Sequence, residues 1–394
     1  MYRFRNLCMT LLTSGMVLGS AASWGATTTG NTLPENPPAP HELPTQPDAS
    51  EAAPQLSPAM LQLRDRMRGV LSARCWQSFN TRDNTPAQIL SLCLAFGCNA
   101  EVWSESQSGK RLNAITCLCW NYPCSGYRLL GYSGEHIAAR VGHGCQHVPG
   151  EFLATLALAR VPASYPVRVD KDVRSVADLV EAEKLDCREG QAMSLKLVGL
   201  AFYVHDDSWQ SESGEVWSLA RMVDLELDRP APTTLEGDME RLLGLTCAVL
   251  RRAKDGAEMD GPFARAEKFL IQRQKHALQT QSAEGFWGPQ YPFGPNTTTD
   301  AASQLRTTGR VLEWLVLSLP QEELRDARAV KAVDYLTRLL EARCRQGNIA
   351  WLSTQEIDVV GHALHALSLY DERMFKPSDV KEPEAAAQTP PVSR

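Results

Sequence analysis

Charged and titratable side chains stand at the predicted starts of several apolar helices, and these are the residues that could do chemistry. A helix N-terminus presents amide groups and a partial positive charge to whatever lies beyond its first turn. If several such helices begin at one place, their flanking side chains share one opening. The predicted ligand-binding residues are Arg82, Asp83, Lys196, Arg241, Arg306 and Arg310, with Glu240, Thr307 and Asp358 beside them.

Three further side chains are candidate catalytic acids or bases: His147, Tyr203 and His362. Imidazole titrates near neutral pH, and a tyrosine hydroxyl can transfer a proton in a suitable site. We expect His147 and His362 to share one cavity with Arg82 and Arg241. The excess of basic groups favours an anionic ligand such as a carboxylated glycan or a phosphate. A solvated rim of charges explains the same residues, and His362 with His365 could be two core histidines.

Seven cysteines lie between residues 75 and 145: Cys75, Cys93, Cys98, Cys117, Cys119, Cys124 and Cys145. In an exported chain such crowding is typical of disulfides, and we expect at least two bridges to involve them. Cys117, Cys119, Cys124 and Cys145 with a nearby histidine could instead bind zinc, although the paired C-x2-C spacing of many zinc sites is absent. We predict no metal and no cofactor. Cys187, Cys247 and Cys344 are expected to be small buried residues.

The elements that must position these residues are predicted to be helices, because apolar residues recur with a period of 3.6 over most of the chain. The predicted helices cover residues 58–76, 85–97, 149–160, 176–185, 193–205, 218–228, 238–252, 262–281, 301–319, 327–343 and 357–370. Start signals such as Asn84-Thr85-Pro86 and Asp260-Gly261-Pro262 support several of them.

Six of these helices contain segments that are apolar almost all round, and the five others carry one apolar stripe and one charged face. A helix that is apolar all round is buried on every side. The alternation predicts an all-α fold, an α/α toroid with six inner helices and five or six outer helices. A stacked superhelix is the alternative, because solenoids also pair helices. Residues 99–148 break the pattern and predict a small disulfide-rich β-hairpin insert, which could be a lid, a partner surface or a structural plug.

The last third of the chain contains a repeated motif. Phe269-Leu270 precedes Gln281, Gly285 and Trp287, and Tyr335-Leu336 precedes Gln346-Gly347 and Trp351. This pattern resembles the α/α toroids of the terpenoid cyclase and protein prenyltransferase superfamily. The resemblance implies the fold only, because the clustered aspartates of the cyclases and the zinc ligands of the transferases are absent.

Two further resemblances involve residues 80–83 and 142–153 and the segment VLEWLVLSLP. Together these segments look like an exported bacterial family to which no activity is assigned. Gly144-Cys145-Gln146 is similar to part of the thioester motif of macroglobulins and complement proteins. Thioester chemistry requires a glutamine three residues after the cysteine, and Val148 occupies that position.

The two ends of the chain differ in composition from the helical part. Residues 1–25 are predicted to be a signal peptide, because a positive start, an apolar run and small residues follow one another. Residues 26–58 are predicted to be a Pro-rich disordered linker and residues 376–394 a disordered tail. The toroid domain is expected over residues 59–375, and the mature protein is expected to be periplasmic or secreted.

Composition excludes several classes of function. The net charge is −6, which argues against a general nucleic-acid binder, and no later segment is long and apolar enough to span a membrane. We therefore expect an exported toroid that binds a partner protein or an anionic cell-envelope polymer without catalysis. The alternative is a toroidal enzyme acting on acidic polysaccharide, as a lyase or a hydrolase. A metal-dependent hydrolase is disfavoured by the lack of H-E-x-x-H or an equivalent motif. The sequence indicates neither the substrate nor an oligomeric state.

Overall fold

The computed structural model describes residues 56–292, 300–347 and 352–375. These residues are mostly helical, as predicted. The α-helices are α2 (Pro58–Leu71), α3 (Pro86–Phe96), α4 (Ala114–Cys119), α5 (Glu151–Leu158), α6 (Val176–Leu185), α7 (Ser194–Tyr203), α8 (Leu219–Asp228), α9 (Leu235–Lys254), α10 (Gly261–Thr280), α11 (Ala301–Ser318), α12 (Ala327–Arg345) and α13 (Thr354–Phe375). Three short 3-10 helices are η1 (Arg74–Ser78), η2 (Gly97–Asn99) and η3 (Glu323–Arg325).

The strands of the described residues form four separate two-stranded antiparallel sheets. They are β1 (Glu101–Trp103) with β2 (Arg111–Asn113), β3 (Leu130–Ser133) with β4 (His136–Ala139), β5 (Pro166–Val169) with β6 (Asp172–Ser175), and β7 (Trp209–Gln210) with β8 (Val216–Trp217). The first two hairpins lie in the predicted insert. The others lie outside it, and their strands are too short to show alternation in the sequence.

The predicted start signals stand at helix N-termini: α3 has a side-chain cap, whereas α10 has Pro262 in its first turn and no side-chain cap from Asp260. The Thr85 side chain accepts the backbone N–H of Gln88, and the Gln88 side chain accepts the backbone N–H of Thr85, so the two residues form a capping box at α3. Pro86 occupies the first turn, where its missing N–H costs no helical hydrogen bond. Asp300 caps α11 in the same region of the molecule by accepting the backbone N–H groups of Ala302 and Ser303.

Six alternate helices contact one another in a closed cycle. In chain order α3, α5, α7, α9, α11 and α13 each contact the next, and α13 contacts α3. These are the helices predicted to be buried on every side. In α11, for example, every residue from Thr307 to Ser318 is buried, whereas α8 buries Met222, Val223 and Glu226. We call these six the cycle helices.

Glycines allow the cycle helices to approach closely. A Cβ atom at Gly244 of α9 would overlap the carbonyl oxygen of Ser194 in α7, and a Cβ at Gly361 of α13 would meet the carbonyl oxygen of Ser91 in α3. Gly199 faces the Leu153 side chain and Gly309 faces Ala363, where a Cβ atom would also be tightly placed. Small residues in these apolar segments are therefore required by packing between neighbouring helices.

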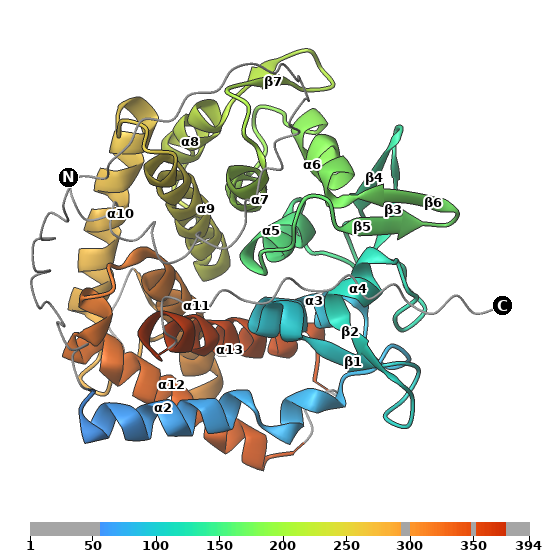
Figure 1. The fold of residues 1–394 in the computed structure, drawn as a ribbon. Coiled ribbons are helices and arrows are strands. Elements are labelled where there is room, and N and C mark those ends of the chain that lie inside the picture. Colours follow the sequence, from blue (N-terminus) through green and yellow to red (C-terminus); the bar gives the residue numbers. More distant parts are fainter. Residues whose placement is uncertain (1–55, 293–299, 348–351, 376–394) are drawn as a thin grey trace, which may run out of the picture.

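The amphipathic helices pack against the cycle helices. α2 contacts α12 and α13, α6 contacts α7, α8 contacts α7 and α9, α10 contacts α9, and α12 contacts α11 and α13. The short helix α4 packs on α3 within the insert. Figure 1 shows α2, in blue, beside α12, in orange, so that helices from opposite ends of the described chain are neighbours.

Covalent and ionic contacts connect α2 and its following turn to α12. Arg66 of α2 donates to Glu341 at 3.1 Å and to Asp334 at 2.7 Å, both in α12. A disulfide joins Cys75 to Cys344, which are 269 residues apart in sequence. The expectation that Cys344 is merely a small buried residue is therefore wrong, because the fold brings the last turn of α12 against the turn after α2.

The insert is not rich in disulfides, which corrects the sequence prediction. Cys117, Cys119, Cys124 and Cys145 are buried and form no disulfide. The Cys117 and Cys124 sulfur atoms lie 3.8 Å apart. The insert has apolar contacts with α3, so it does not depend on disulfides for its packing. Burial raises the pKa of the Cys119 thiol. Its cysteines act as small core residues.

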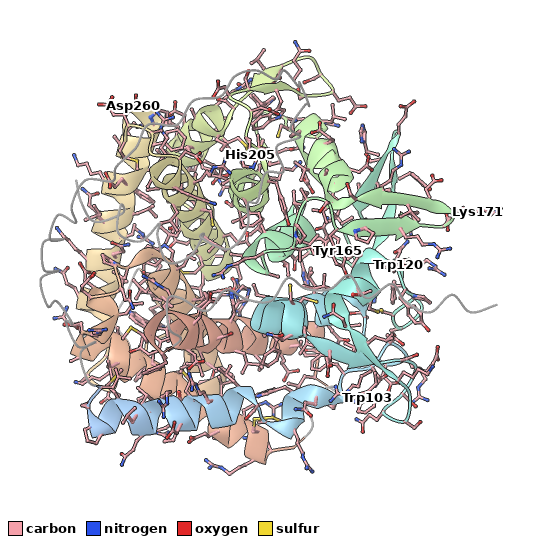
Figure 2. The ribbon with its side chains drawn as sticks, viewed as in Figure 1. Trp103, Trp120, Tyr165, Lys171, His205 and Asp260 are labelled. Atoms are coloured by element: carbon pink, nitrogen blue, oxygen red, sulfur yellow. A yellow bond between two sulfur atoms is a disulfide. The ribbon has the colours of Figure 1, made fainter. Side chains whose placement is uncertain are left out.

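The hairpins of the insert lie beside a third hairpin on one side of the molecule (Figure 1). Tyr132 of β3 donates a hydrogen bond to Asp172 of β6 at 2.8 Å, and the Ile137 backbone N–H donates to Asp178 of α6 at 2.7 Å. Lys171 lies at the outer tip of the β5–β6 hairpin (Figure 2). The insert therefore packs against the rest of the structure through polar contacts as well as through its core.

The first copy of the repeated motif forms a turn after α10. Trp287 is fully buried, its indole N–H donates to the Ala277 carbonyl at 2.8 Å, and its backbone N–H donates to Thr308 of α11 at 3.2 Å. The Gln281 amide donates to the Gly285 carbonyl at 2.9 Å. The tryptophan thus connects α10 to α11.

Some predictions concern residues outside the described ranges. They are the signal peptide, nearly all of the Pro-rich linker, the C-terminal tail and Trp351 of the second motif copy. Across the described ranges, no helix combines the length and the apolar character needed to cross a bilayer.

Candidate functional site

A cavity of about 520 Å³ lies toward the N-terminal parts of α7, α9 and α13 and is also lined by α5 and by the middle of α3 and α11. We call it the N-end cavity. Its walls include apolar side chains from α3, α5, α7, α9 and α11, among them Leu90, Ala154, Leu195, Leu243 and Trp314. Its polar lining consists mainly of His147, Glu151, Glu236, Glu240, Arg306, Arg310, Glu313, Asp358 and His362. The cavity volume falls within the range of small-molecule sites.

Glu313 of α11 lies between two histidines of α13. One carboxylate oxygen accepts a hydrogen bond from His362 Nδ1 at 2.6 Å, and the other accepts one from His365 Nδ1 at 2.5 Å. Burial by itself would raise the pKa of Glu313, but the two histidines outweigh burial and lower the pKa to about 2. Glu313 is therefore a buried carboxylate whose two oxygens are both occupied.

Asp358 connects His362 to Arg310. Its Oδ2 accepts a hydrogen bond from the Arg310 guanidinium at 2.5 Å, and its Oδ1 lies 3.5 Å from His362 Nε2. Burial and the charge of Arg310 oppose protonation of His362, but Glu313 and Asp358 outweigh them and raise its pKa to about 9. His362 is thus an imidazolium at neutral pH, held from both sides by carboxylates.

Glu240 of α9 differs from Glu313 and Asp358 in its hydrogen-bond partners and in the direction of its pKa shift. No hydrogen bond or ion pair is recorded for its side chain among the described residues. Burial raises the pKa of Glu240, and the negative charges of Glu151 and Asp358 add to this, against the opposing charges of Arg310 and His362. The cavity therefore contains one carboxyl group whose pKa is raised, Glu240, beside two whose pKa values are lowered, Glu313 and Asp358.

Two pairs complete the polar lining. The Glu151 carboxylate, in the first turn of α5, accepts the His147 backbone N–H at 2.6 Å and lies 3.6 Å from His147 Nδ1. The nearby Glu151 carboxylate raises the pKa of His147. Arg306 of α11 pairs with Glu236 of α9 at 2.7 Å, and its side chain is 39% exposed. This guanidinium lies where an incoming ligand could contact it.

The structure brings together only part of the predicted set. His147, Glu240, Arg306, Arg310, Asp358 and His362 line the N-end cavity. The expectation of an excess of basic groups there is wrong, because the lining holds the five carboxyl groups of Glu151, Glu236, Glu240, Glu313 and Asp358 against two guanidiniums and two histidines. Two of these carboxyl groups, Glu151 and Glu236, stand in the first turns of α5 and α9, where a helix N-terminus favours acidic side chains.

Four predicted ligand-binding residues do not line this cavity. Arg82 is exposed and pairs with its neighbour Asp83 at 3.2 Å. Lys196 is fully buried and pairs with Asp186 at 2.7 Å and with Glu183 at 3.1 Å. Arg241 is buried and donates to the Leu227 carbonyl at 2.9 Å. Arg241 follows Glu240 directly, so on a helix its side chain points about 100° away from the cavity.

Tyr203 lies at the other end of the cycle helices. Its hydroxyl donates to the Val161 carbonyl at 2.7 Å, and burial raises its pKa. It lines a second cavity, formed by the C-terminal parts of α5, α7, α9 and α11. The hydroxyl is therefore occupied and distant from the N-terminal ends where it was expected to act.

Sequence reasoning did not select Glu151, Glu236 and Glu313 as site residues. A signal for Glu313 exists: it is a single carboxylate within the apolar segment VLEWLVLSL. A buried carboxylate needs cationic or hydrogen-bonding partners. Histidines at positions i and i+3 of a neighbouring buried helix, such as His362 and His365, are suitable partners.

The cysteine-rich segment offers no metal site in the structure. In the ranges that the structure describes, no three His, Cys, Asp or Glu side chains are grouped so that they could hold a metal ion. The carboxylates and histidines of the N-end cavity instead pair with one another and with arginines. Their arrangement suits proton transfer and hydrogen bonding to a polar ligand.

When the chain is compared with protein-family models, curated proteins and solved structures, no match is found.

Proposed function

We propose that the cycle helices and the helices around them form an α/α toroid and that the N-end cavity is its functional site. The contact between α13 and α3 supports the toroid, because the first and last units of a superhelix lie far apart. The separation of N-terminal and C-terminal lining residues into two cavities supports it as well.

We further propose that this toroid is a polysaccharide hydrolase. The observation that carries this proposal is the position of the partly buried Glu240 carboxyl group, which lines the cavity together with Glu151 and whose pKa is raised by burial. Glycoside hydrolysis uses such a pair, one carboxylic acid that protonates the leaving oxygen and one carboxylate that activates water or attacks the sugar. Glu240 is the proposed acid.

Glu151 is the proposed partner carboxylate. Glu313 and Asp358 have low pKa values and are held by histidine and arginine groups, which makes them weak bases. Glu151 accepts a hydrogen bond from a backbone N–H, and its side chain is 19% exposed. Arg310, Glu313, Asp358 and His362 would then act as a rigid charged wall that orients the substrate.

A lyase is less well supported than a hydrolase. A polysaccharide lyase must neutralise a uronate carboxylate with cations that are available to the substrate. Arg310 is buried and paired with Asp358, and His362 lies between two carboxylates. Arg306, partly exposed, is the guanidinium that could exchange Glu236 for an acidic substituent of the substrate.

The proposed location is periplasmic or secreted. The Cys75–Cys344 disulfide supports it, because such bonds persist in oxidising compartments.

The test is hydrolysis of a panel of neutral and uronate-containing polysaccharides, followed by measurement of new reducing ends. We expect Glu240→Gln and Glu151→Gln each to lower kcat about 100-fold or more, since general acid–base groups contribute about 10²–10⁴. Arg82→Ala is the matched control, because Arg82 is exposed outside the cavity. Equal activity of the wild type and Glu240→Gln would contradict the proposed acid.

Non-catalytic binding of an anionic envelope polymer or a partner protein is the second candidate. The observation in its favour is that Arg310, Glu313, Asp358 and His362 already satisfy one another. Saturable binding of a panel member without any product, in both the wild type and Glu240→Gln, would establish this function and exclude the hydrolase.

A further inference from the structure

A second cavity, of about 510 Å³, lies at the C-terminal parts of the cycle helices. We call it the C-end cavity. Leu158, at the end of α5, lines both cavities, and no other lining residue is shared. None of the charged residues in the proposed hydrolytic site faces the C-end cavity, so the two cavities differ in chemistry.

The walls of the C-end cavity are apolar. Contributions come from α5, α7, α9 and α11 and include Leu158, Val198, Ala201, Phe202, Leu250 and Leu317. The Tyr203 hydroxyl is turned to the Val161 carbonyl, so it needs no partner in the cavity. Burial of methylene groups against such walls is favourable and not directional, which suits a flexible alkyl chain.

The charged lining of the C-end cavity is basic. It contains Arg160, His205, Arg251 and Lys254, and no carboxyl group is part of it. Arg160 pairs with Glu372 at 2.6 Å, so its charge is compensated from outside the cavity. His205 lies just beyond α7 (Figure 2), and its Nδ1 accepts a hydrogen bond from the Arg251 guanidinium at 2.8 Å. Burial and the charge of Arg251 lower the pKa of His205, so the imidazole is a neutral acceptor.

Arg251 and Lys254 stand at the end of α9. Arg251 pairs with Asp255 at 2.6 Å and donates to the carbonyl groups of Ala201 and Phe202, which satisfies the C-terminal end of α7. Lys254 is exposed, and no ion pair is recorded for it within the described ranges. Its ammonium group is therefore available to an anion at the cavity opening.

We propose that the C-end cavity binds the anion of an unbranched fatty acid. The alkyl chain lies between the walls from α5, α7, α9 and α11, and the carboxylate meets the Lys254 ammonium group. The separation of an apolar interior from a basic opening carries this assignment, because a carbohydrate or a nucleotide would need polar groups inside. The site is independent of the proposed hydrolase.

The test uses decanoate below its critical micelle concentration and measures binding to the full chain by calorimetry. Decanoate is expected to bind at one site, whereas decyltrimethylammonium, with the same chain and a cationic head group, is expected to bind at least about tenfold more weakly. Either no decanoate binding or equal binding of the two surfactants would overturn the proposal.

Two variants locate the site. Ala163 lines the cavity and is exposed, so Ala163→Trp should fill the opening without disturbing the core, and decanoate affinity should fall at least about tenfold. Lys254→Glu should lower the affinity for decanoate about fivefold and leave the affinity for decyltrimethylammonium unchanged. Lys171→Glu, on a distant hairpin tip, is the matched charge control (Figure 2).

Circular dichroism would show that each variant is folded. Decanoate affinity unchanged in Ala163→Trp would place the ligand elsewhere and overturn the assignment. Binding of decanoate only together with phosphatidylglycerol vesicles, and never in their absence, would indicate a membrane surface in place of a fatty-acid site and also overturn it. Polysaccharide hydrolysis is measured separately, so failure of one proposal does not affect the other.

Discussion

Glu313, in the wall of the N-end cavity, is the side chain that joins two histidines. It is buried in α11, and its two oxygens hold His362 and His365 of α13. A carboxylate in this environment is stable only while its two hydrogen-bonding partners remain, because a lone buried charge is strongly disfavoured. The same contacts join two neighbouring cycle helices and keep His362 protonated.

Replacing Glu313 should therefore destabilise the protein as well as alter the cavity. Glu313→Gln leaves His362 and His365 without their shared anion, and we expect a loss of about 3 kcal/mol in the free energy of unfolding. Denaturant unfolding at pH 7 measures it. Glu341→Gln, in the partly exposed pair with Arg66, should cost less than about 1 kcal/mol. Equal losses in the two variants would contradict the role of Glu313.

The elevated pKa of His362 predicts a pH dependence with a definite sign. Its folded-state pKa of about 9 exceeds the ordinary value of 6.5. The protonated histidine thus contributes stability that is fully present below pH 6.5 and is lost as pH rises through about 9. We expect the free energy of unfolding of the wild type to fall by about 1–3 kcal/mol between pH 6.5 and 9.5.

Thermal unfolding across this pH range provides the measurement. His362→Gln should be less stable at pH 6.5 and should show a flatter pH profile than the wild type. His147→Gln is the comparison and should change the profile less, since His147 is about half exposed and lies 3.6 Å from one carboxylate, that of Glu151. A His362→Gln profile parallel to that of the wild type would show that this imidazole does not carry the dependence.

At the scale of the elements, glycine positions decide how closely the cycle helices pack. Gly244 faces the Ser194 carbonyl across the contact between α9 and α7, where no room remains for a methyl group. Gly69, exposed in α2, has no atom within 4 Å of where its Cβ would lie. The two residues have the same intrinsic helix propensity and opposite surroundings.

Alanine at these two positions should have opposite effects. Gly69→Ala is expected to stabilise the protein by about 0.5–1 kcal/mol, because it reduces the entropy of the unfolded chain. Gly244→Ala is expected to destabilise it by about 1–3 kcal/mol, because overpacking outweighs the same gain. Denaturant midpoints of both variants give the answer. Stabilisation by Gly244→Ala would mean that α7 and α9 are not in close contact.

The disulfide between the turn after α2 and α12 is a second element-scale feature. Cys75→Ser with Cys344→Ser should lower the free energy of unfolding by about 2–4 kcal/mol, since the bridge closes a loop of most of the described chain. A reducing agent should lower the stability of the wild type and leave the double variant unchanged. If the reductant affects both proteins alike, another bridge is present.

At the scale of the whole molecule, the contact between α13 and α3 makes the ends of the described chain depend on one another. α13 also contacts α2, α11 and α12. Because a closed arrangement has no free terminal unit, the loss of one cycle helix exposes the apolar faces of helices from both ends of the chain. An open superhelix would lose only its last repeat.

A chain that ends after Gln346 tests this dependence. Without α13 we expect no cooperative unfolding transition and loss of the near-ultraviolet circular dichroism of buried tryptophans such as Trp76 and Trp314. A chain that begins at residue 56 is the control, and its thermal midpoint is expected to match that of the full chain. Retention of a cooperative transition in the shorter chain would favour an open superhelix.

The sequence by itself determined the helices outside the insert, because their periodicity, caps and composition are local properties; the short helix α4 within the insert was not predicted. The sequence separated the helices buried on all sides from the amphipathic ones, and it selected His147, Glu240, Arg310 and Asp358, which line one cavity, although Arg310 lies in the middle of α11 and not at its start. It also marked the insert as a break in the helical pattern, since Gly and short alternating segments act over a few residues.

Only the tertiary structure decided which charges face one another. Adjacent residues on a helix point in different directions, so Glu240 lines the cavity while Arg241 is turned into the packing between helices. The Glu313 histidine contacts and the Cys75–Cys344 bridge join residues far apart in the chain. Such pairings depend on how the helices close around one another, and no local pattern in the sequence carries that information.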